Sequence, residues 1–282
     1  MLGPLLLSHS TVSPLDIRTR EPVCQPFQDL VMLRTVFHIT FLSLITVVPA
    51  MAADGWGSVS GKILWKGDIP APKLLHPKGA SIKNGNVCAS EDVYDDELVI
   101  DQDSRGISHV FVYLRKAPKN IHPDQMNFPA SVTFDQKNCM FTPHTLLVRA
   151  GQTVEVLNSD SVSHNTNLTP IRNRGQNQVI APLTSKGKGT PYPLPKAEPL
   201  PSTVKCDFHP WMEARWLVLD HPYAAITKKD GSFEIKDLPV GTHKFRVWHE
   251  LQGYLERSLS VEIKDGETVE LEPREYRIKT KG

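Results

Sequence analysis

The stretch that indicates the fold class is residues 145–158, which read Thr-Leu-Leu-Val-Arg-Ala-Gly-Gln-Thr-Val-Glu-Val-Leu-Asn. Two short apolar or alternating runs, 145–150 and 153–157, flank Ala150-Gly151-Gln152. Runs of this length are typical of strands, and glycine accepts the positive φ that many tight turns need. The stretch therefore predicts two strands joined by a tight turn.

The same pattern recurs along most of the chain. No amphipathic run of helical period is longer than two turns, and proline accounts for 23 of the 282 residues, which disfavours long helices. We expect an all-β protein built of β-sandwiches, with residues 172–202, rich in Gly, Pro, Lys and Asn, as a polar surface excursion. The other expected strands are 57–65, 98–101, 107–114, 130–134, 203–207, 215–220, 224–227, 232–235, 243–249, 259–263 and 268–271.

The N-terminal residues predict export rather than a folded element. Residues 32–52 are typical of a secretory signal peptide, with a basic start at Arg34, an apolar centre and the small-x-small site Ala50-Met51-Ala52. The apolar centre is about 13 residues long, whereas a helix needs about 20 to span a bilayer, so we expect no integral membrane span after signal cleavage. Residues 1–31 are interpreted as an over-extended gene start, with an unusually long leader as the alternative. A membrane-tethered product is the alternative if cleavage fails. The expected location is periplasmic or secreted.

The overall charge excludes one class of partner. The chain has 32 Lys and Arg residues against 31 Asp and Glu residues, a net charge of +1. A chain with so little net charge has no global basic field, so we expect no nucleic-acid partner.

The residues with metal-binding chemistry gather at 206–212, which read Cys-Asp-Phe-His-Pro-Trp-Met. A thiolate, an imidazole and a thioether lie within seven residues, and Ser163-His164-Asn165 follows the strand-like run 153–158. Two histidines and one cysteine with a weak axial methionine form the ligand set of a blue-copper centre. Thiolate and thioether suit Cu(I), whereas imidazole suits both oxidation states. The residue types therefore predict copper.

Three alternatives to a copper site fit these residues less well. A zinc site usually has four strong ligands and no thioether. A catalytic Cys–His pair gives no reason for Met212. The third alternative places Cys206 and Met212 in the core and His209 on the surface. His144 is interpreted as a structural residue, because no ligand position remains for it.

The ligand stretch resembles a known family. Cys-x-x-His-x-x-Met with Pro210 after the histidine is similar to the ligand loop of the cupredoxins, the amicyanin type in particular, and residues 141–160 followed by His164 resemble the strands that lead to the first histidine ligand. The resemblance covers roughly 130–220 and departs from the family at Glu213-Ala214. It implies one type 1 copper ion and a supporting residue whose backbone N–H contacts the cysteine sulfur and whose side chain ties the ligand loops together. The implied copper ligands are His164, Cys206, His209 and Met212, and the implied supporting residue is Asn165.

The resemblance implies an electron carrier and not an enzyme, since all four metal positions are filled by protein. His209 is the expected exposed edge for transfer to a redox partner protein. Trp211 is either a docking aromatic or a packing residue. The alternative function is a binding or structural protein of the cell envelope, with copper in a structural or storage role. Copper delivery is a third, weaker possibility.

The residues on either side of this stretch resemble a second family. Residues 230–247 resemble the carboxypeptidase regulatory-like β-sandwich, which is similar to transthyretin, and residues 57–67 and 110–114 resemble its first two strands. We therefore predict a regulatory-like domain made of 54–129 and 221–282, with a cupredoxin domain, 130–220, inserted between them. Two tandem domains are the alternative.

The cysteines complete the expectations. Cys24 leaves with the leader, and copper ligation needs a free thiolate at Cys206. Cys88 and Cys139 can then form a disulfide. Two buried free thiols are the alternative.

Overall fold

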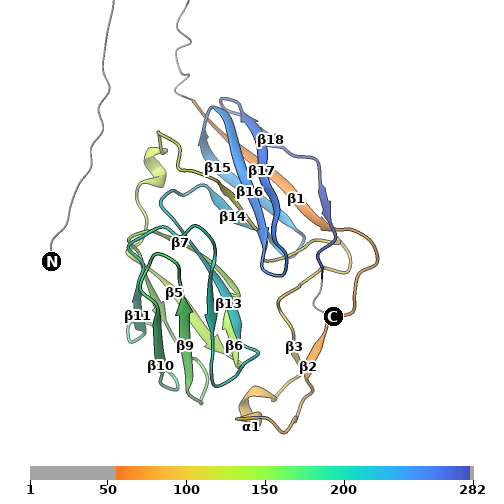
Figure 1. Ribbon diagram of the computed structural model, residues 1–282, viewed down its shortest axis with the longest axis vertical. Helices are drawn as coiled ribbons and strands as arrows, with labels where there is room; N and C mark the ends of the chain where they lie inside the picture. Colours follow the sequence, from red (N-terminus) through yellow and green to blue (C-terminus); the bar gives the residue numbers. More distant parts are fainter. Residues whose placement is uncertain (1–54, 280–282) are drawn as a thin grey trace, which may run out of the picture. The chain divides into compact units, whose positions relative to one another are not determined.

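The computed structural model describes residues 55–279, so the proposed extension, 1–31, and signal peptide, 32–52, lie outside the described residues. The chain divides into units 1–50 and 51–282, and the following concerns the second. In the described part, 19 strands accompany one short α-helix, α1 (Gly85–Cys88), and one 3-10 helix, η1 (Pro123–Gln125) (Figure 1). The predicted all-β fold is confirmed. Among these residues no helix has the length and apolar content to cross a membrane.

The strands between residues 131 and 219 form one sandwich, here called the middle sandwich. Its sheets enclose a core in which Phe134, Val154, Tyr192 and Trp216 are fully buried. The five-stranded sheet has the order β10 (Gln176–Ile180), β9 (His164–Thr169), β12 (Ser202–Lys205), β13 (Glu213–Leu219), β7 (Thr145–Arg149). The four-stranded sheet has the order β11 (Thr190–Pro193), β8 (Thr153–Val156), β5 (Ser131–Lys137), β6 (Met140–Thr142).

The predicted turn at Ala150-Gly151-Gln152 connects these two sheets. Gly151 has a φ of 99°, a conformation that a side chain would strain. β7 and β8 confirm the two strands expected around it, but they lie in different sheets and do not pair with each other. Val148 and Val154 are both buried in the shared core. The turn therefore carries the chain from one sheet to the other.

Strands from both ends of the described chain form a second sandwich, here called the outer sandwich. β1, orange in Figure 1, lies beside the blue strands β15 and β18. Ile63, Phe233 and Phe245 are buried in its core. One sheet contains β15 (Ser232–Pro239), β1 (Trp56–Trp65) and β18 (Thr268–Glu270), with β19 (Arg274–Tyr276) also paired to β1. The other contains β14 (Ala224–Ile226), β4 (Phe111–Leu114), β16 (Gly241–His249) and β17 (Gly253–Ile263).

These pairings put β4 next to β14 although the strands of the middle sandwich separate them in the chain. β2 (Leu74–His76) and β3 (Val93–Tyr94) pair with each other in a separate ribbon. The exact domain boundaries, 129/130 and 220/221, stay predictions.

Two expectations about local structure are wrong. Residues 172–202 are not merely a surface excursion, since they contain β10 and β11 and bury Ile180, Tyr192 and Leu194. β10 is an edge strand with three consecutive exposed residues, so its sequence lacks the apolar alternation of a half-buried strand. Residues 98–101 form only a bridge from Ile100 to Ile107, because the Asp101 carboxylate accepts a hydrogen bond from the Ser104 backbone and shapes a turn instead.

A buried polar cluster contains residues of both sandwiches. The His144 ring forms ion pairs with Asp96, at 2.9 Å from Nδ1, and with Glu250 through Nε2. Glu250 also pairs with Arg215 Nη2 at 3.2 Å. Burial lowers the pKa of His144, but the hydrogen bonds to the two carboxylates outweigh it and raise the value to about 10. His144 is therefore a buried cation, which agrees with its interpretation as structural.

Two further histidines border this cation and should make the protein sensitive to acid. Burial, followed by the charge of His144, lowers the pKa of His109 to about 4, and burial with neighbouring positive charges lowers that of His249 to about 3. Both values lie below the value of about 6.5 of an unfolded histidine. Stability should therefore fall as the pH falls below 6.5, by about 1.4 kcal/mol per pH unit for each histidine.

Urea unfolding at pH 6.5, 5.5 and 4.5 checks this expectation. His109→Gln removes one of the two groups and should make the acid slope shallower. Equal slopes in the variant and the wild type would contradict it.

Candidate metal centre

The ligand loop, residues 206–212, connects the antiparallel strands β12 and β13. Its backbone closes on itself, since Cys206 N donates to Met212 O at 3.1 Å and Met212 N donates to His209 O at 2.9 Å. Cys206 is 1% exposed, and His209 and Met212 are fully buried. The loop therefore holds three of the four predicted ligands in one turn, with all three of these side chains buried.

His164 reaches the same place from β9. It is the first residue of that strand, and β9 pairs with β12 immediately before the loop. His164 Nδ1 lies 2.9 Å from His209 Nδ1 and 3.9 Å from Cys206 Sγ, and His209 Nδ1 lies 3.8 Å from that sulfur. The structure thus brings two imidazole nitrogens and one sulfur together.

These three atoms fit a shared metal ion. Nitrogen and sulfur ligands bind ions such as zinc at about 2.0–2.3 Å, so two ligands of one ion of this size lie no more than roughly 4.5 Å apart. All three separations meet this condition. The thioether of the buried Met212 adds a second soft donor to the loop, a composition that suits copper better than zinc.

Cys206 has the chemistry of a metal ligand. It is the one free cysteine within residues 55–279. Burial raises its pKa, but hydrogen bonds involving His164 and His209, with smaller contributions from the backbone of Asn165 and His209, outweigh burial and bring the pKa to about 6. The thiolate that copper requires is therefore the favoured form at neutral pH.

Asn165 connects β9 to the ligand loop. Its Oδ1 accepts a hydrogen bond from Asp207 N at 2.7 Å and lies 3.4 Å from Cys206 Sγ. Its Nδ2 donates to Asn177 Oδ1 and Asp207 Oδ2. The side chain therefore fixes the strand that carries His164 against the turn that carries Cys206.

Both ligand imidazoles also have a partner on the outer nitrogen. His164 Nε2 lies 2.9 Å from Asp160 Oδ2, and His209 Nε2 lies 3.1 Å from Asn84 Oδ1. An acceptor at Nε2 holds a proton on that nitrogen, so Nδ1 is the nitrogen available to bind a metal. Sequence reasoning missed both residues. The short spacing of four residues between Asp160 and His164 could have indicated the first contact. Nothing in the sequence points to Asn84.

Residues 76–92, here called the cap segment, cover the ligand loop. The predicted disulfide between Cys88 and Cys139 is confirmed and attaches α1 to the turn after β5. The Lys83 ammonium lies 4.4 Å from the centre of the Phe208 ring, and the His76 and Trp211 rings meet edge to face at 4.6 Å. These contacts add to the hydrogen bond between Asn84 and His209.

The expectation that His209 forms an exposed edge is wrong. The residue has no exposed surface, because Asn84 and Trp211 cover its ring. Trp211 also donates through Nε1 to Cys139 O at 3.0 Å. Trp211 is predicted from the sequence to be either a docking aromatic or a packing residue. These contacts are those of a residue that packs over the ligand loop.

Two further groups of residues in the described chain have ligand atoms close enough for a metal. They are Cys88, Cys139 and His209, and Cys139, Asp160 and His164. The sulfurs of Cys88 and Cys139 are bonded to each other, so neither group offers a thiolate. Both groups share a histidine with the first site, which leaves that site as the candidate centre.

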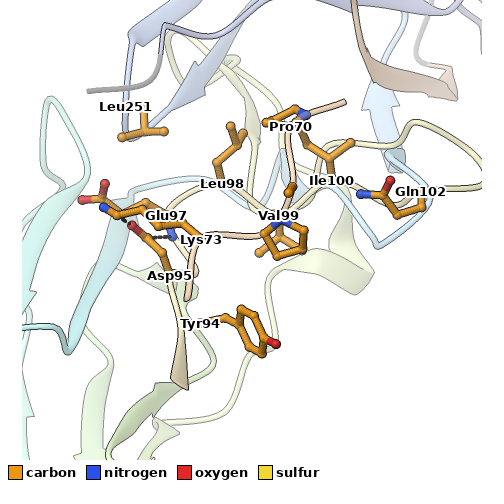
Figure 2. A pocket seen from close by; sticks show the side chains of 12 residues that line it. Pro70, Lys73, Tyr94, Asp95, Glu97, Leu98, Val99, Ile100, Gln102 and Leu251 are labelled. Carbon is orange, nitrogen blue, oxygen red and sulfur yellow. Dashed lines mark hydrogen bonds and ion pairs between the residues drawn. The ribbon is translucent and has the colours of Figure 1, made fainter. Parts of the chain in front are cut away.

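An apolar pocket of about 260 Å³ lies elsewhere. Figure 2 shows Pro70, Leu98, Ile100 and Leu251 around it, with Lys73 and Asp95 joined by an ion pair. It shares no residue with the metal centre, so it does not bear on the metal chemistry.

Comparisons with known proteins find similarity only among solved structures. No family model and no curated protein matches the chain. A mutant of amicyanin in the Cu(I) form is 18% identical over 32% of this chain and 83% of its own, with a TM-score of 0.27. A purple cupredoxin from Nitrosopumilus maritimus is 20% identical over 32% of this chain and all of its own, with a TM-score of 0.26. A copper-containing nitrite reductase from Thermus scotoductus SA-01 is 22% identical over 33% of this chain and 23% of its own, with a TM-score of 0.25. Scores this low carry no argument about function, which must come from the side chains.

Proposed function

We propose that this protein is an electron carrier with one type 1 copper ion bound by His164, Cys206, His209 and Met212. The observation that supports it best is the buried convergence of His209 Nδ1 and the free Cys206 sulfur, both from the ligand loop, with His164 Nδ1 from β9. The donor set contains a thiolate and a thioether, which stabilise Cu(I), and imidazoles, which suit both oxidation states. When bound, copper supplies one-electron chemistry between Cu(II) and Cu(I).

The surrounding residues favour electron transfer over catalysis. The hydrogen bonds that close the turn, together with Asn165, hold the donors in place, so little has to move when the charge changes. The four donors leave no open position for a substrate, which a catalytic metal requires. The proposal is therefore a carrier and not an enzyme.

The partner of such a carrier is a redox protein. The His209 ring contacts Asn84 and Trp211, both of which are partly exposed. We propose that electrons reach the surface through these contacts. The partner would then dock over the cap segment and not directly on a histidine edge.

The disulfide supports a periplasmic or secreted location. Disulfides persist mainly in oxidising compartments, and the Cys88–Cys139 bond lies beside the centre. The signal peptide predicted at 32–52 agrees with this location.

Copper titration tests the proposal. Residues 53–282 should bind one equivalent of Cu(II) and develop intense thiolate-to-copper absorption, which ascorbate should bleach reversibly. Cys206→Ser should abolish the band, because no other free thiol is present in residues 55–279. His243→Ala, which changes a histidine outside the centre, should leave the band intact.

Two outcomes would count against it. Folded wild-type protein without the band would contradict copper–thiolate binding. A band that no reductant bleaches would indicate the structural or storage role instead of electron transfer.

A further inference from the structure

Asp160 places a buried carboxylate behind the first histidine of the centre. Its side chain is 5% exposed, and its Oδ2 lies 2.9 Å from His164 Nε2. The other ligand histidine has a neutral partner at the equivalent atom, the amide oxygen of Asn84 at 3.1 Å from His209 Nε2. The two imidazoles therefore differ in the charge of the group that accepts their outer proton.

The chain holds this carboxylate in a fixed orientation. Asp160 Oδ1 accepts a hydrogen bond from Asn138 N at 2.7 Å, and Oδ2 accepts one from Cys139 N at 2.8 Å. Asn138 and Cys139 have φ angles of 53° and 54°, a left-handed turn that points both N–H groups at the carboxylate. The Asp160 backbone N–H donates to Asn158 Oδ1 at 3.0 Å. Together, these hydrogen bonds hold the carboxylate with Oδ2 facing His164.

We propose that Asp160 is a positioning residue that acts through His164 to lower the reduction potential of the bound metal. This inference rests on the proposed function. A carboxylate that accepts the Nε2 proton increases the basicity of the imidazole and fixes the tautomer that has its lone pair on Nδ1. A more basic ligand favours the more highly charged Cu(II). The carboxylate is buried, so solvent screens its charge weakly.

A pair of reciprocal substitutions tests it. Asp160→Asn removes the charge behind His164 and should raise the midpoint potential. Asn84→Asp adds a carboxylate behind His209 and should lower it. The potential is measured by redox titration of the thiolate-to-copper absorption in the full chain from residue 53.

A second measurement needs no metal. The ¹⁵N shifts of His164 in copper-free protein, recorded at a pH high enough to keep the ring neutral, should report the Nε2–H tautomer in the wild type and a mixture of tautomers in Asp160→Asn. A purely structural role for Asp160 predicts no such change in a variant that folds.

The outcomes separate this inference from the proposed function. Wild type that develops no copper–thiolate band refutes the function itself. Wild type with a reversible band, but with both variants at the wild-type potential or shifted in the same direction, refutes the role of Asp160 alone. If Asp160→Asn does not fold, the ¹⁵N shifts of His164 in the wild type still decide, because Asp160 is the group that faces its Nε2. A wild-type ring without the proton on Nε2 overturns the inference.

Discussion

Replacing Cys88 and Cys139 together by serine should lower the free energy of unfolding by about 4 kcal/mol. The disulfide joins residues separated by 51 positions, and opening a loop of this length restores that much conformational entropy to the unfolded chain. Urea unfolding of metal-free protein measures the loss. Wild type unfolded in the presence of a thiol reductant should match the double variant. A loss below 1 kcal/mol would contradict the prediction.

The same double variant should release copper faster. The disulfide attaches the cap segment, whose Asn84 accepts a hydrogen bond from the buried His209. Without this attachment the cap should open more often and expose the ligand loop to solvent. Transfer of Cu(I) to a strong chelator, followed by stopped flow, measures the rate. Asn84→Ala, which keeps the disulfide, is the matched control and should accelerate release less.

Glu250→Gln should lower the free energy of unfolding by about 3 kcal/mol at pH 6.5, because removing one partner leaves buried charges uncompensated. The Glu250 side chain is 3% exposed and pairs with both His144 and Arg215. Chemical denaturation measures the change. Glu234→Gln, which removes the partner of the exposed Lys236, is the matched control and should cost no more than about 1 kcal/mol.

The pH dependence distinguishes the Glu250 ion pairs from mere packing. The folded pKa of His144, about 10, lies above its unfolded value of about 6.5. The stability that this histidine contributes is therefore fully present below pH 6.5 and is lost as the pH rises to 10. Glu250→Gln removes one of the two carboxylates that raise this pKa, so its stability should decline less over that interval. A parallel decline in both proteins would contradict the ion-pair explanation.

Much of the fold class could be predicted from short-range sequence patterns. The alternation in residues 153–157 and the glycine at 151 are local properties, since side chains of a strand alternate every two residues and glycine tolerates positive φ anywhere. These patterns do not identify a strand that has one exposed face and few apolar residues. β10 is such a strand, because nothing in its own residues indicates that it lies at the edge of a sheet.

The candidate ligands show the same division. Cys206, His209 and Met212 lie within one turn, so their spacing alone brought them together. His164 is 42 residues from Cys206 and reaches it only through the pairing of β9 with β12. Resemblance to a ligand loop also implied an exposed His209 edge. That expectation failed, because it took no account of a segment more than 100 residues upstream.

The sequence by itself determined the all-β class and which residue types could serve as donors, because strand alternation, turn residues and donor chemistry are properties of single residues and near neighbours. Only the tertiary structure decided what surrounds those donors. Asn84 lies 125 positions from His209, and Cys88 lies 51 positions from Cys139. Contacts at such separations depend on how the chain packs as a whole. The burial of His209 and the charged partner of His164 follow from that packing.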